Sequence, residues 1–421
     1  MEGKASTPLD TSRSSARIGP SLRHLPERWH RAPRRWGHPL HSVCSYFAMF
    51  PPQIAHVFIS WLTQPGEIVY DPFSGRGTVP LEAVLSGRIG LGSDANPLAH
   101  SLTQAKVAVP SYVDIDKRLS ELEKNYRNWR TEPEAVPDDI AMLYAPGTLR
   151  QLVFLRMRLD CTDATDAFLI AMILGMLHAN HSRQGATKGF SISMPNTFAM
   201  SPGYVAKYIE EHDLHKPEVD TFAMLSDRAQ RLKLPSEAIV GGKAWLQDAT
   251  ADLPGWLHEN KPKLIFTSPP YLEVIKYGKY NWVRLWFLGE SARKVDDRLM
   301  ASGSLDRYVD FMTKVFINLR AILSDDGYLC LVIGDVRREN GDLNLAEVVW
   351  ERVAQPLGWH RHAIIADHLP AGQKVSRIWK NNEGRATKVD RLLLLSPRNQ
   401  DLPALKAIRW RGTGFAERAT V

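Results

Sequence analysis

Cysteine is scarce in this chain of 421 residues, and long apolar runs are missing. Only Cys44, Cys161 and Cys330 occur, and they form no CxxC pair. They therefore provide neither a disulfide framework nor a zinc cluster, and they suit a reducing cytoplasm. The most apolar stretch, residues 167–177, is shorter than the roughly 20 residues that cross a bilayer, so we expect no membrane partner.

An apolar signal core is also absent from the Ser- and Arg-rich start of the chain. We expect a cytoplasmic protein, although this composition leaves mitochondrial targeting open. Hydrophobic residues make up 44% and charged residues 24%, which argues against wholesale disorder. The formal net charge of +7 favours an anionic partner such as nucleic acid, but many basic proteins bind none.

Residues 1–39 show neither helical nor strand periodicity, and we expect a basic N-terminal arm there. Four arginines interleave with Trp29 and Trp36: Arg28, Arg31, Arg34 and Arg35. Such a cluster suits phosphate contact and base stacking. A solvated tail is an equally good interpretation.

A glycine turn, Asp71-Pro-Phe-Ser-Gly-Arg-Gly-Thr78, follows a predicted buried strand at 67–70. It has neither the Gly-Lys-Ser/Thr of a P-loop nor GxGxxG spacing. A helix through 80–85 and a second strand at 89–92 come next, and this unit predicts a parallel, doubly wound sheet. Glycines in such a turn let the backbone lie against a ligand that a side chain would displace.

Two acidic residues follow predicted strands. Asp94 comes just after the strand at 89–92, where a carboxylate can accept hydrogen bonds from both ribose hydroxyls of an adenosine moiety. Capping of the helix that begins at Asn96-Pro97 is the alternative interpretation. Asp248 follows a presumed third strand, for which the apolar segment 238–240 is the signal, and is a weaker candidate for holding the adenine amino group.

The segment Thr267-Ser-Pro-Pro-Tyr271 ends a predicted strand at 263–266, and its two prolines fix carbonyls out of the ladder. An exocyclic amine of a base is planar and a poor nucleophile. Accepting its hydrogens at Ser268 Oγ and the Pro269 carbonyl would favour a tetrahedral nitrogen, while Tyr271 stacks on the extruded ring. Alone the segment is more simply a rigid turn, but the order of elements favours catalysis.

The glycine turn, Asp94-Ala-Asn-Pro97 and the proline segment, in this order, resemble the amino-methylating DNA methyltransferases over residues 40–110 and 238–396. The resemblance implies S-adenosylmethionine as cofactor, with an extra cofactor-binding element at 41–51. The candidate cofactor-binding residues are Phe47, Met49, Asp71, Phe73, Gly75, Gly77, Thr78, Asp94 and Asp248. The candidate catalytic residues are Ser268, Pro269, Pro270 and Tyr271. Core packing is the alternative for Phe47 and Met49.

The resemblance implies a Rossmann-like methyltransferase fold, which is an α/β fold with a mostly parallel doubly wound sheet. Its last strands form an antiparallel hairpin, for which 362–365 and 392–395 are the candidates. Long helical stretches without a convincing strand predict a helical insertion between about 110 and 235, at 112–129, 148–159, 163–180, 202–211 and 217–232. A long helix from near 304 to 323 and a strand at 328–333 are also predicted. The expected organisation is an arm at 1–39, a catalytic domain at 40–110 and 236–400, an insertion at 111–235 and a C-terminal tail at 401–421.

Ser at the first position of the proline motif is commoner in family members that methylate N4 of cytosine, whereas Asp or Asn is commoner for N6 of adenine. We therefore expect a site-specific DNA methyltransferase of restriction-modification or epigenetic type that acts on N4 of a flipped cytosine. A cognate restriction endonuclease is a candidate partner, and the oligomeric state stays open. The alternatives are N6 of adenine, then RNA guanine-N2 or a protein amide, then a non-catalytic nucleic-acid-binding module.

Cytosine C5 chemistry is disfavoured, because it needs a cysteine nucleophile, typically after a proline, and no cysteine follows one here. No metal is required, since the sulfonium already activates the methyl group. The insertion, 111–235, is a candidate target-recognition region, although it lies before the proline motif and not in the usual place. Further candidate DNA contacts are the loops at 178–190 and 374–388, and residues 276–284 are candidates for covering the flipped base, with core packing as the stronger interpretation of Trp282.

Overall fold

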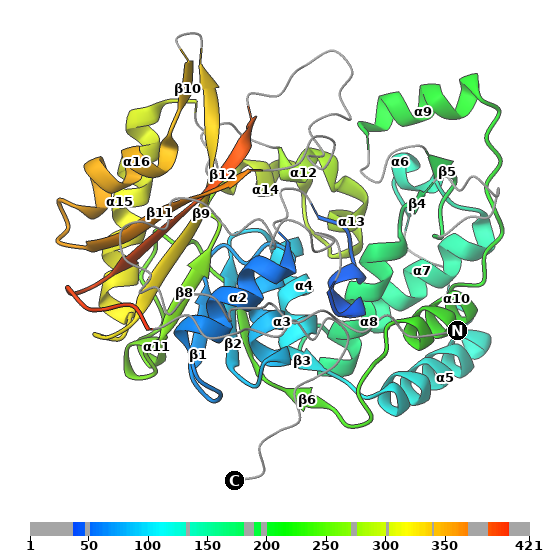
Figure 1. The fold of residues 1–421 in the computed structure, drawn as a ribbon. Coiled ribbons are helices and arrows are strands. Elements are labelled where there is room, and N and C mark those ends of the chain that lie inside the picture. Colours follow the sequence, from blue (N-terminus) through cyan, green and yellow to red (C-terminus); the bar gives the residue numbers. More distant parts are fainter. Residues whose placement is uncertain are drawn as a thin grey trace, which may run out of the picture.

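The strands of the central sheet alternate their side chains between two buried faces. The computed structural model describes residues 37–46, 51–131, 135–180, 189–194, 200–270, 276–299, 303–338, 341–368 and 386–403. Its eight-stranded sheet has the order β11-β12-β9-β8-β1-β2-β7, with β10 paired to β9 (Figure 1). The strands are β1 (Ile68–Asp71), β2 (Ile89–Asp94), β7 (Gly242–Leu246), β8 (Leu264–Thr267), β9 (Tyr328–Arg338), β10 (Gly341–Leu343), β11 (His360–His368) and β12 (Ala386–Ser396).

Strands β7, β2, β1, β8 and β9 are parallel, whereas β12 is antiparallel to both β9 and β11. The predicted mostly parallel sheet with a terminal hairpin is therefore confirmed. The chain order reverses at β1, which has β2 on one side and β8 on the other. In doubly wound sheets ligands bind beyond the carboxyl ends of the strands at such a reversal, so this edge is where a site is expected.

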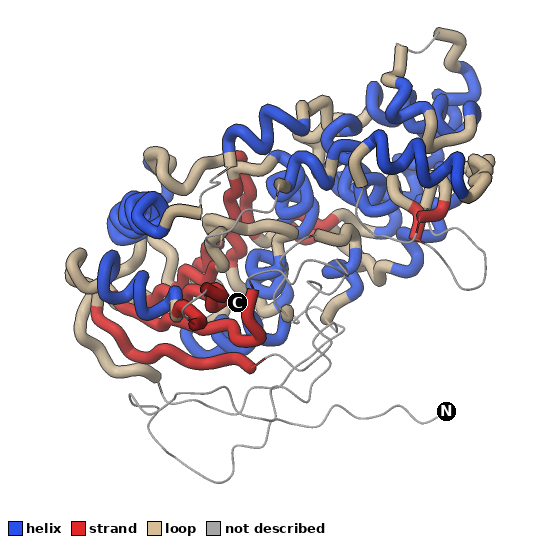
Figure 2. The backbone as a smooth tube through the Cα atoms, turned by 90° about the horizontal axis from the view of Figure 1, so that it is seen from above, coloured by secondary structure: helices blue, strands red, loops and turns tan. Residues whose placement is uncertain are grey.

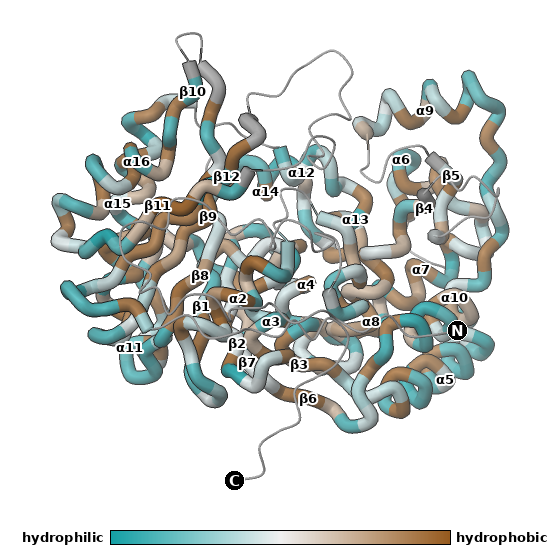
Figure 3. The backbone as a smooth tube through the Cα atoms, in the orientation of Figure 1, coloured by the Kyte–Doolittle hydropathy of each residue, from teal (hydrophilic) through white to brown (hydrophobic). Residues whose placement is uncertain are grey.

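Helices cover both faces of the sheet. In β1, Val69 packs towards α2 (Pro52–Leu62), whereas Tyr70 packs towards α15 (Leu305–Ile322). The α2 side also holds α3 (Thr78–Leu85) and α4 (Pro97–Val107). The α15 side also holds α11 (Gly255–Glu259), α16 (Leu345–Val349) and the π-helical turn η2 (Trp350–Ala354). Figure 3 shows the hydrophobic residues concentrated along β9, β11 and β12, as burial on both faces requires.

A helix-rich region lies beside the sheet at one end of the molecule, as Figure 2 shows from above. It shares one apolar core with α4. Its elements are α5 (Tyr112–Asn128), α6 (Asp138–Ala141), α7 (Pro146–Arg158), α8 (Ala164–Met176), β4 (Ala179–Asn180), β5 (Ser193–Met194), α9 (Pro202–Glu211) and α10 (Thr221–Arg231). The helices that periodicity predicts here are present, whereas the short parallel pair β4 and β5 was not predicted.

One strand prediction needs correction. The apolar segment at 238–240 does not join the main sheet, because β6 (Ile239–Val240) pairs with β3 (Ala108–Val109) in a separate antiparallel pair. The strand beside β2 is β7, which carries Lys243 and Trp245. An edge strand is half exposed and needs no continuous apolar run, so hydrophobic pattern alone did not reveal it.

Three short helices follow the proline motif: α12 (Tyr277–Tyr280), α13 (Trp282–Phe287) and α14 (Ala292–Arg298). A single 3₁₀ turn, η1 (Pro39–Ser42), begins the described part of the chain. Within the described ranges, none of the helices has the length and apolarity needed to cross a membrane.

Candidate functional site

Asp71 joins the glycine turn to the proline motif. Its Oδ1 accepts hydrogen bonds from Thr267 Oγ1 at 2.5 Å and from the Phe73 amide at 3.1 Å. The side chain is 1% exposed, and this burial raises the pKa of Asp71 to about 7. Asp71 thus supports the two motifs from within the sheet, and its direct contact with a cofactor stays a prediction.

The glycine turn folds back on itself in a conformation that other residues rarely adopt. Gly77 has φ +73°, donates its amide to the Ser74 carbonyl at 2.7 Å and begins α3. A Cβ at Gly77 would lie 2.9 Å from Thr103 Cα, and one at Gly75, where φ is +51°, would lie 3.4 Å from the Tyr46 ring. The turn is therefore a backbone cradle that side chains would fill, which fits a ligand lying close to it.

Asp94 lies at the end of β2 and faces the glycine turn. Its Oδ2 accepts the Gly75 amide and its Oδ1 accepts the Asn96 amide, both at 2.9 Å. The residue is partly exposed, and a carboxylate has about four acceptor positions, so it fits the two hydroxyls of a ribose. Burial raises the pKa of Asp94 to about 6. Helix α4 is capped by Asn96, whose side chain accepts the Leu98 amide, and not by Asp94.

An aromatic pair lies beside this carboxylate. Tyr46 was not assigned from the sequence, and Tyr277 was placed in the 276–284 segment that was expected to cover a flipped base. Tyr46 and Tyr277 stack with ring centroids 5.5 Å apart, and Asn96 Nδ2 donates to the Tyr46 hydroxyl at 2.9 Å. Tyr46 directly precedes the nominated Phe47 and Met49, which lie outside the described residues. Its position in the same segment was the available signal, whereas its pairing with Tyr277 was not visible in sequence.

The first residue of the proline motif points its hydroxyl at the neighbouring strand. Ser268 Oγ donates to the Val332 carbonyl of β9 at 3.0 Å, and the residue is partly exposed. Pro269 is buried and Pro270 is partly buried, while Tyr271 lies outside the described residues. A hydroxyl whose one hydrogen is already donated to a carbonyl can only accept a hydrogen bond from any further group.

The other candidate residues spread around this edge. Phe73 packs against Phe311 of α15, with ring centroids 6.0 Å apart. Thr78 is buried at the start of α3. Asp248 is exposed beyond β7, and its Oδ1 accepts both the amide and the hydroxyl of Thr250 at 2.8 Å. Asp248 therefore lies beyond the carboxyl end of β7, at the edge of the sheet where a site is expected, but its side chain is engaged in the turn with Thr250.

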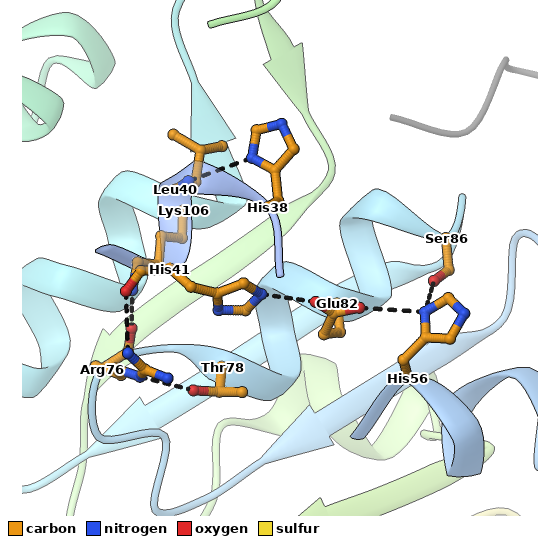
Figure 4. Close-up of polar contacts among 9 residues, drawn as sticks. All are labelled: His38, Leu40, His41, His56, Arg76, Thr78, Glu82, Ser86 and Lys106. Atoms are coloured by element: carbon orange, nitrogen blue, oxygen red, sulfur yellow. Dashed lines mark hydrogen bonds and ion pairs between the residues drawn. The ribbon is translucent and has the colours of Figure 1, made fainter. Parts of the chain in front are cut away.

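Residues 38–46, which we name the strap, are fixed to the glycine turn and to α3 by polar contacts (Figure 4). His41 Nε2 lies 2.6 Å from Glu82 Oε1, and His56 Nδ1 lies 3.2 Å from the other carboxylate oxygen. Arg76 Nη1 donates to the His41 carbonyl at 3.0 Å. Although burial acts to raise it, the hydrogen bonds from both histidines hold the pKa of Glu82 below its usual range. Burial lowers the pKa of His41 to about 4, so this is a neutral histidine on a buried carboxylate.

The predicted DNA contacts in the arm and in the loops at 178–190 and 374–388 lie largely outside the described residues, as does the tail beyond 403. In the part of the chain that is described, no group of three or more His, Cys, Asp or Glu side chains could hold a metal ion.

Comparison with known proteins gives both sequence and structural likenesses. A family profile described as DNA methylase, covering N6 and N4 enzymes, matches residues 15–105. The chain is 22% identical over 296 residues to the type II methyltransferase M.MvaI of Kocuria varians, a match that covers 64% of this chain and 63% of that protein.

Among solved structures, the rRNA methyltransferase aviRa of Streptomyces viridochromogenes matches with a TM-score of 0.32 and 10% identity, covering 83% of this chain and 87% of that one. A TehB-like SAM-dependent methyltransferase of Corynebacterium glutamicum matches with a TM-score of 0.30 and 8% identity, covering 82% and 87%. Likeness at this level adds no argument about substrate.

Proposed function

We propose that this chain, a member of the amino-methylating DNA methyltransferases, transfers a methyl group from S-adenosylmethionine to the exocyclic N4 of cytosine in DNA. Family membership rests on the ordered motifs and on the two sequence matches. The observation that carries the proposal is the meeting of three motifs at the carboxyl ends of β1, β2 and β8, where Thr267 donates to Asp71 and Gly75 donates to Asp94.

The residues that would hold the cofactor are those of the cradle. The turn at Gly75 and Gly77 would lie against its methionine part, and the Asp94 carboxylate would accept from the ribose hydroxyls. When bound, the cofactor supplies an activated methyl group on a sulfonium. Tyr46 and Tyr277 form an apolar wall beside Asp94 that would exclude water from the adenosine part.

Ser268 is suited to act on the target amine. Because its proton is donated to the Val332 carbonyl, its oxygen would accept a hydrogen from the N4 amine, and the Pro269 carbonyl would accept the second. Drawing those hydrogens out of the ring plane makes the nitrogen lone pair available for attack on the methyl carbon. The methyl–sulfur bond would break with its electron pair left on sulfur, and the nitrogen would release one proton. A base held in this way must leave the duplex, so the proposal includes base flipping, with Tyr271 stacking on the ring.

DNA as substrate is supported by the family match and by the net charge of +7. We assign residues 40–110 and 236–400 to catalysis and the helical region at 111–235 to target recognition. Ser268 supports cytosine N4 over adenine N6. The type II relative supports a restriction-modification role, in which a cognate endonuclease would act on the same DNA sequence.

The test is methyl transfer to DNA of varied sequence, followed by nucleoside analysis of the product. We expect N4-methylcytosine from the wild type and a rate about 100-fold lower from Ser268→Ala, the usual cost of one oriented hydrogen-bonding group in an active site. The matched control is Ser324→Ala. Its hydroxyl also donates to a carbonyl, that of Pro262, but Ser324 lies just before β9, at the opposite edge of the sheet.

Each other product has a defined meaning. N6-methyladenine would replace cytosine by adenine as the target, and transfer to RNA in preference to DNA would replace the substrate class. Equal activity of wild type and Ser268→Ala would remove the proposed role of the proline motif. Failure of the wild type to bind S-adenosylmethionine would leave a nucleic-acid-binding module.

A further inference from the structure

Arg284 of α13 is a buried cation bound to neutral acceptors. It is 1% exposed, and its guanidinium makes four hydrogen bonds. Nε donates to the Leu174 carbonyl at 3.0 Å, Nη1 to the Ser45 carbonyl at 3.0 Å and to Asn281 Oδ1 at 2.9 Å, and Nη2 to Ser45 Oγ at 2.9 Å. Within the described ranges no carboxylate pairs with it. Burying a charge without an opposite charge is costly, so a packing role alone is a poor reason for an arginine here.

The acceptors of Arg284 come from three segments that are far apart in sequence. Ser45 lies in the strap, Leu174 in α8 of the helical region, and Asn281 between α12 and α13. The planar guanidinium holds these groups in a fixed relative orientation, which the single ammonium of a lysine does not reproduce. The strap is thereby held against the segment that follows the proline motif.

A continuous path of contacts leads from Arg284 to the carboxylate of Asp94. Asn281 Nδ2 donates to the Tyr277 carbonyl at 2.8 Å, and the Tyr277 ring stacks on Tyr46. The Tyr46 hydroxyl accepts a hydrogen bond from the Asn96 side chain, and the backbone amide of Asn96 donates to Asp94 Oδ1. Arg284 therefore contacts the residue before Tyr46 and, through Asn281, the turn that carries Tyr277.

A second arginine that contacts α13 offers a contrast. Arg156 of α7 donates through Nε to the Trp286 carbonyl at 3.0 Å, and its guanidinium lies 5.5 Å from the centre of the Trp286 ring. It anchors α13 from the helical region, and its hydrogen bond and its ring contact both go to Trp286 and not to the strap or Asn281. If Arg284 only anchored α13 as Arg156 does, substitution at either position would have the same effect on cofactor binding.

We propose that Arg284 is a positioning residue for the cofactor, which sets the Tyr46–Tyr277 pair against Asp94 and so couples cofactor binding to the segment after the proline motif. This inference rests on the proposed role of Asp94 as the ribose acceptor. Arg284 would touch neither the cofactor nor the target base, but it would determine how well the cofactor site is formed.

The test measures cofactor binding without DNA, by calorimetry with S-adenosylmethionine, for Arg284→Lys, Tyr277→Leu, the double variant and the control Arg156→Lys. We expect Arg284→Lys to raise Kd on the order of tenfold because the pair is no longer held in place, while Arg156→Lys stays within about twofold. The double variant should bind within about threefold of the weaker single variant, since both changes act on one contact path.

Steady-state kinetics separate positioning from general damage. Arg284→Lys should raise the KM for the cofactor and leave kcat at saturating cofactor within about threefold of wild type. Should Arg284→Lys fail to fold, Ser45→Ala removes only the Nη2 contact and should weaken cofactor binding in the same direction.

A Kd for Arg284→Lys within twofold of wild type, an equal loss in Arg156→Lys, or fully multiplicative effects of Arg284→Lys and Tyr277→Leu would overturn the inference. For Ser45→Ala, an unchanged Kd would do the same. Wild-type protein that binds the cofactor but methylates no DNA would overturn the proposed function and leave this inference standing. Wild-type protein that binds no cofactor would overturn both.

Discussion

Thr267 and Asp71 are 196 positions apart, yet their hydrogen bond holds the glycine turn and the proline motif at one edge of the sheet. The carboxyl is fully enclosed, and its pKa of about 7 means that both protonation states are present near neutral pH. The Thr267 hydroxyl is therefore a donor to a buried acid. Its loss leaves Asp71 Oδ1 with the Phe73 amide as its hydrogen-bond donor.

The first prediction concerns this hydroxyl. Thr267→Val should lower the free energy of unfolding by about 1–3 kcal/mol, because a buried acceptor loses its partner at nearly constant side-chain volume. Urea unfolding measures the change. The control is Thr313→Val, whose hydroxyl donates to the backbone carbonyl of Val309 within α15. A loss no greater than in the control would show that the pair contributes nothing specific.

Gly77 supports a second prediction at this scale. Gly77→Ala places a side chain at φ +73° and within 2.9 Å of Thr103 Cα, so we expect a loss of about 1–3 kcal/mol in the free energy of unfolding. Gly255→Ala, where nothing lies within 4 Å of the new Cβ, should change stability by less than about 0.5 kcal/mol. Equal melting temperatures for the two variants would contradict the geometry of the turn.

At the scale of elements, the strap depends on side chains from its neighbours more than on its own short 3₁₀ turn. Arg76 of the glycine turn, Arg228 of α10 and Arg284 of α13 each donate to a strap carbonyl, those of His41, Ser42 and Ser45 respectively. Hydrogen bonds to backbone carbonyls fix the path of the chain whatever its side chains are. The strap thus enters the site already positioned.

The contact between the strap and α3 gives the third prediction. His41→Leu removes the closer hydrogen-bond partner of the buried Glu82 carboxylate and should destabilise the protein by about 2–3 kcal/mol, the usual cost of losing a hydrogen bond to a charged group. His56→Leu should cost less, since its ring lies farther from Glu82 and is 14% exposed. Chemical unfolding of the two variants decides the order, and a reversed order would contradict this account of the strap.

At the scale of the whole molecule, acid acts on stability through two opposed sets of groups. Burial lowers the pKa values of His38 and His41 to about 4, so the stability they give is present above pH 6.5 and is lost as the pH falls towards 4. Burial raises the pKa values of Asp71 and Asp94 to about 7 and about 6. As the pH falls, these carboxyls bind protons in the folded state at a higher pH than in the unfolded state. They therefore add stability through the same range.

The fourth prediction follows from that opposition. Between pH 6.5 and 4.5, Asp71→Asn should make the free energy of unfolding fall more steeply with acid than in the wild type, and His41→Asn should make it fall less steeply. Each group contributes up to about 1.4 kcal/mol per pH unit where its folded and unfolded protonation differ fully. Urea titrations across this range measure the slopes, and parallel slopes for wild type and both variants would exclude the assigned pKa shifts.

Much of the fold was predictable from local pattern. Helical periodicity located α5, α7, α9 and α15 within a few residues, and apolar runs located β1, β8, β9 and β12. The edge strand β7 was not predicted because Lys243 and the two glycines before it leave no apolar run long enough to indicate a strand. Among site residues, the glycine turn, Asp94 and Ser268 could be identified from the sequence, because each lies in a short contiguous motif. Tyr46 does not stand out, since nothing local distinguishes a site tyrosine from an ordinary one. Tyr277 and Arg284 were nominated only as part of the 276–284 segment expected to cover the flipped base, and their contacts with the strap were not visible in sequence.

The sequence by itself determined which chemistry is present: a glycine turn after a strand, an acid after the next strand and two prolines after a third, in the order of an amino-methyltransferase. Tertiary structure alone decided which of these groups meet. The reversal of strand order at β1 brings Thr267 onto Asp71, and the burial of Arg284 joins the strap to the segment beyond the proline motif. Local pattern encodes the conformation of a segment, whereas contacts across nearly two hundred residues or more depend on strand order and packing, which no single segment contains.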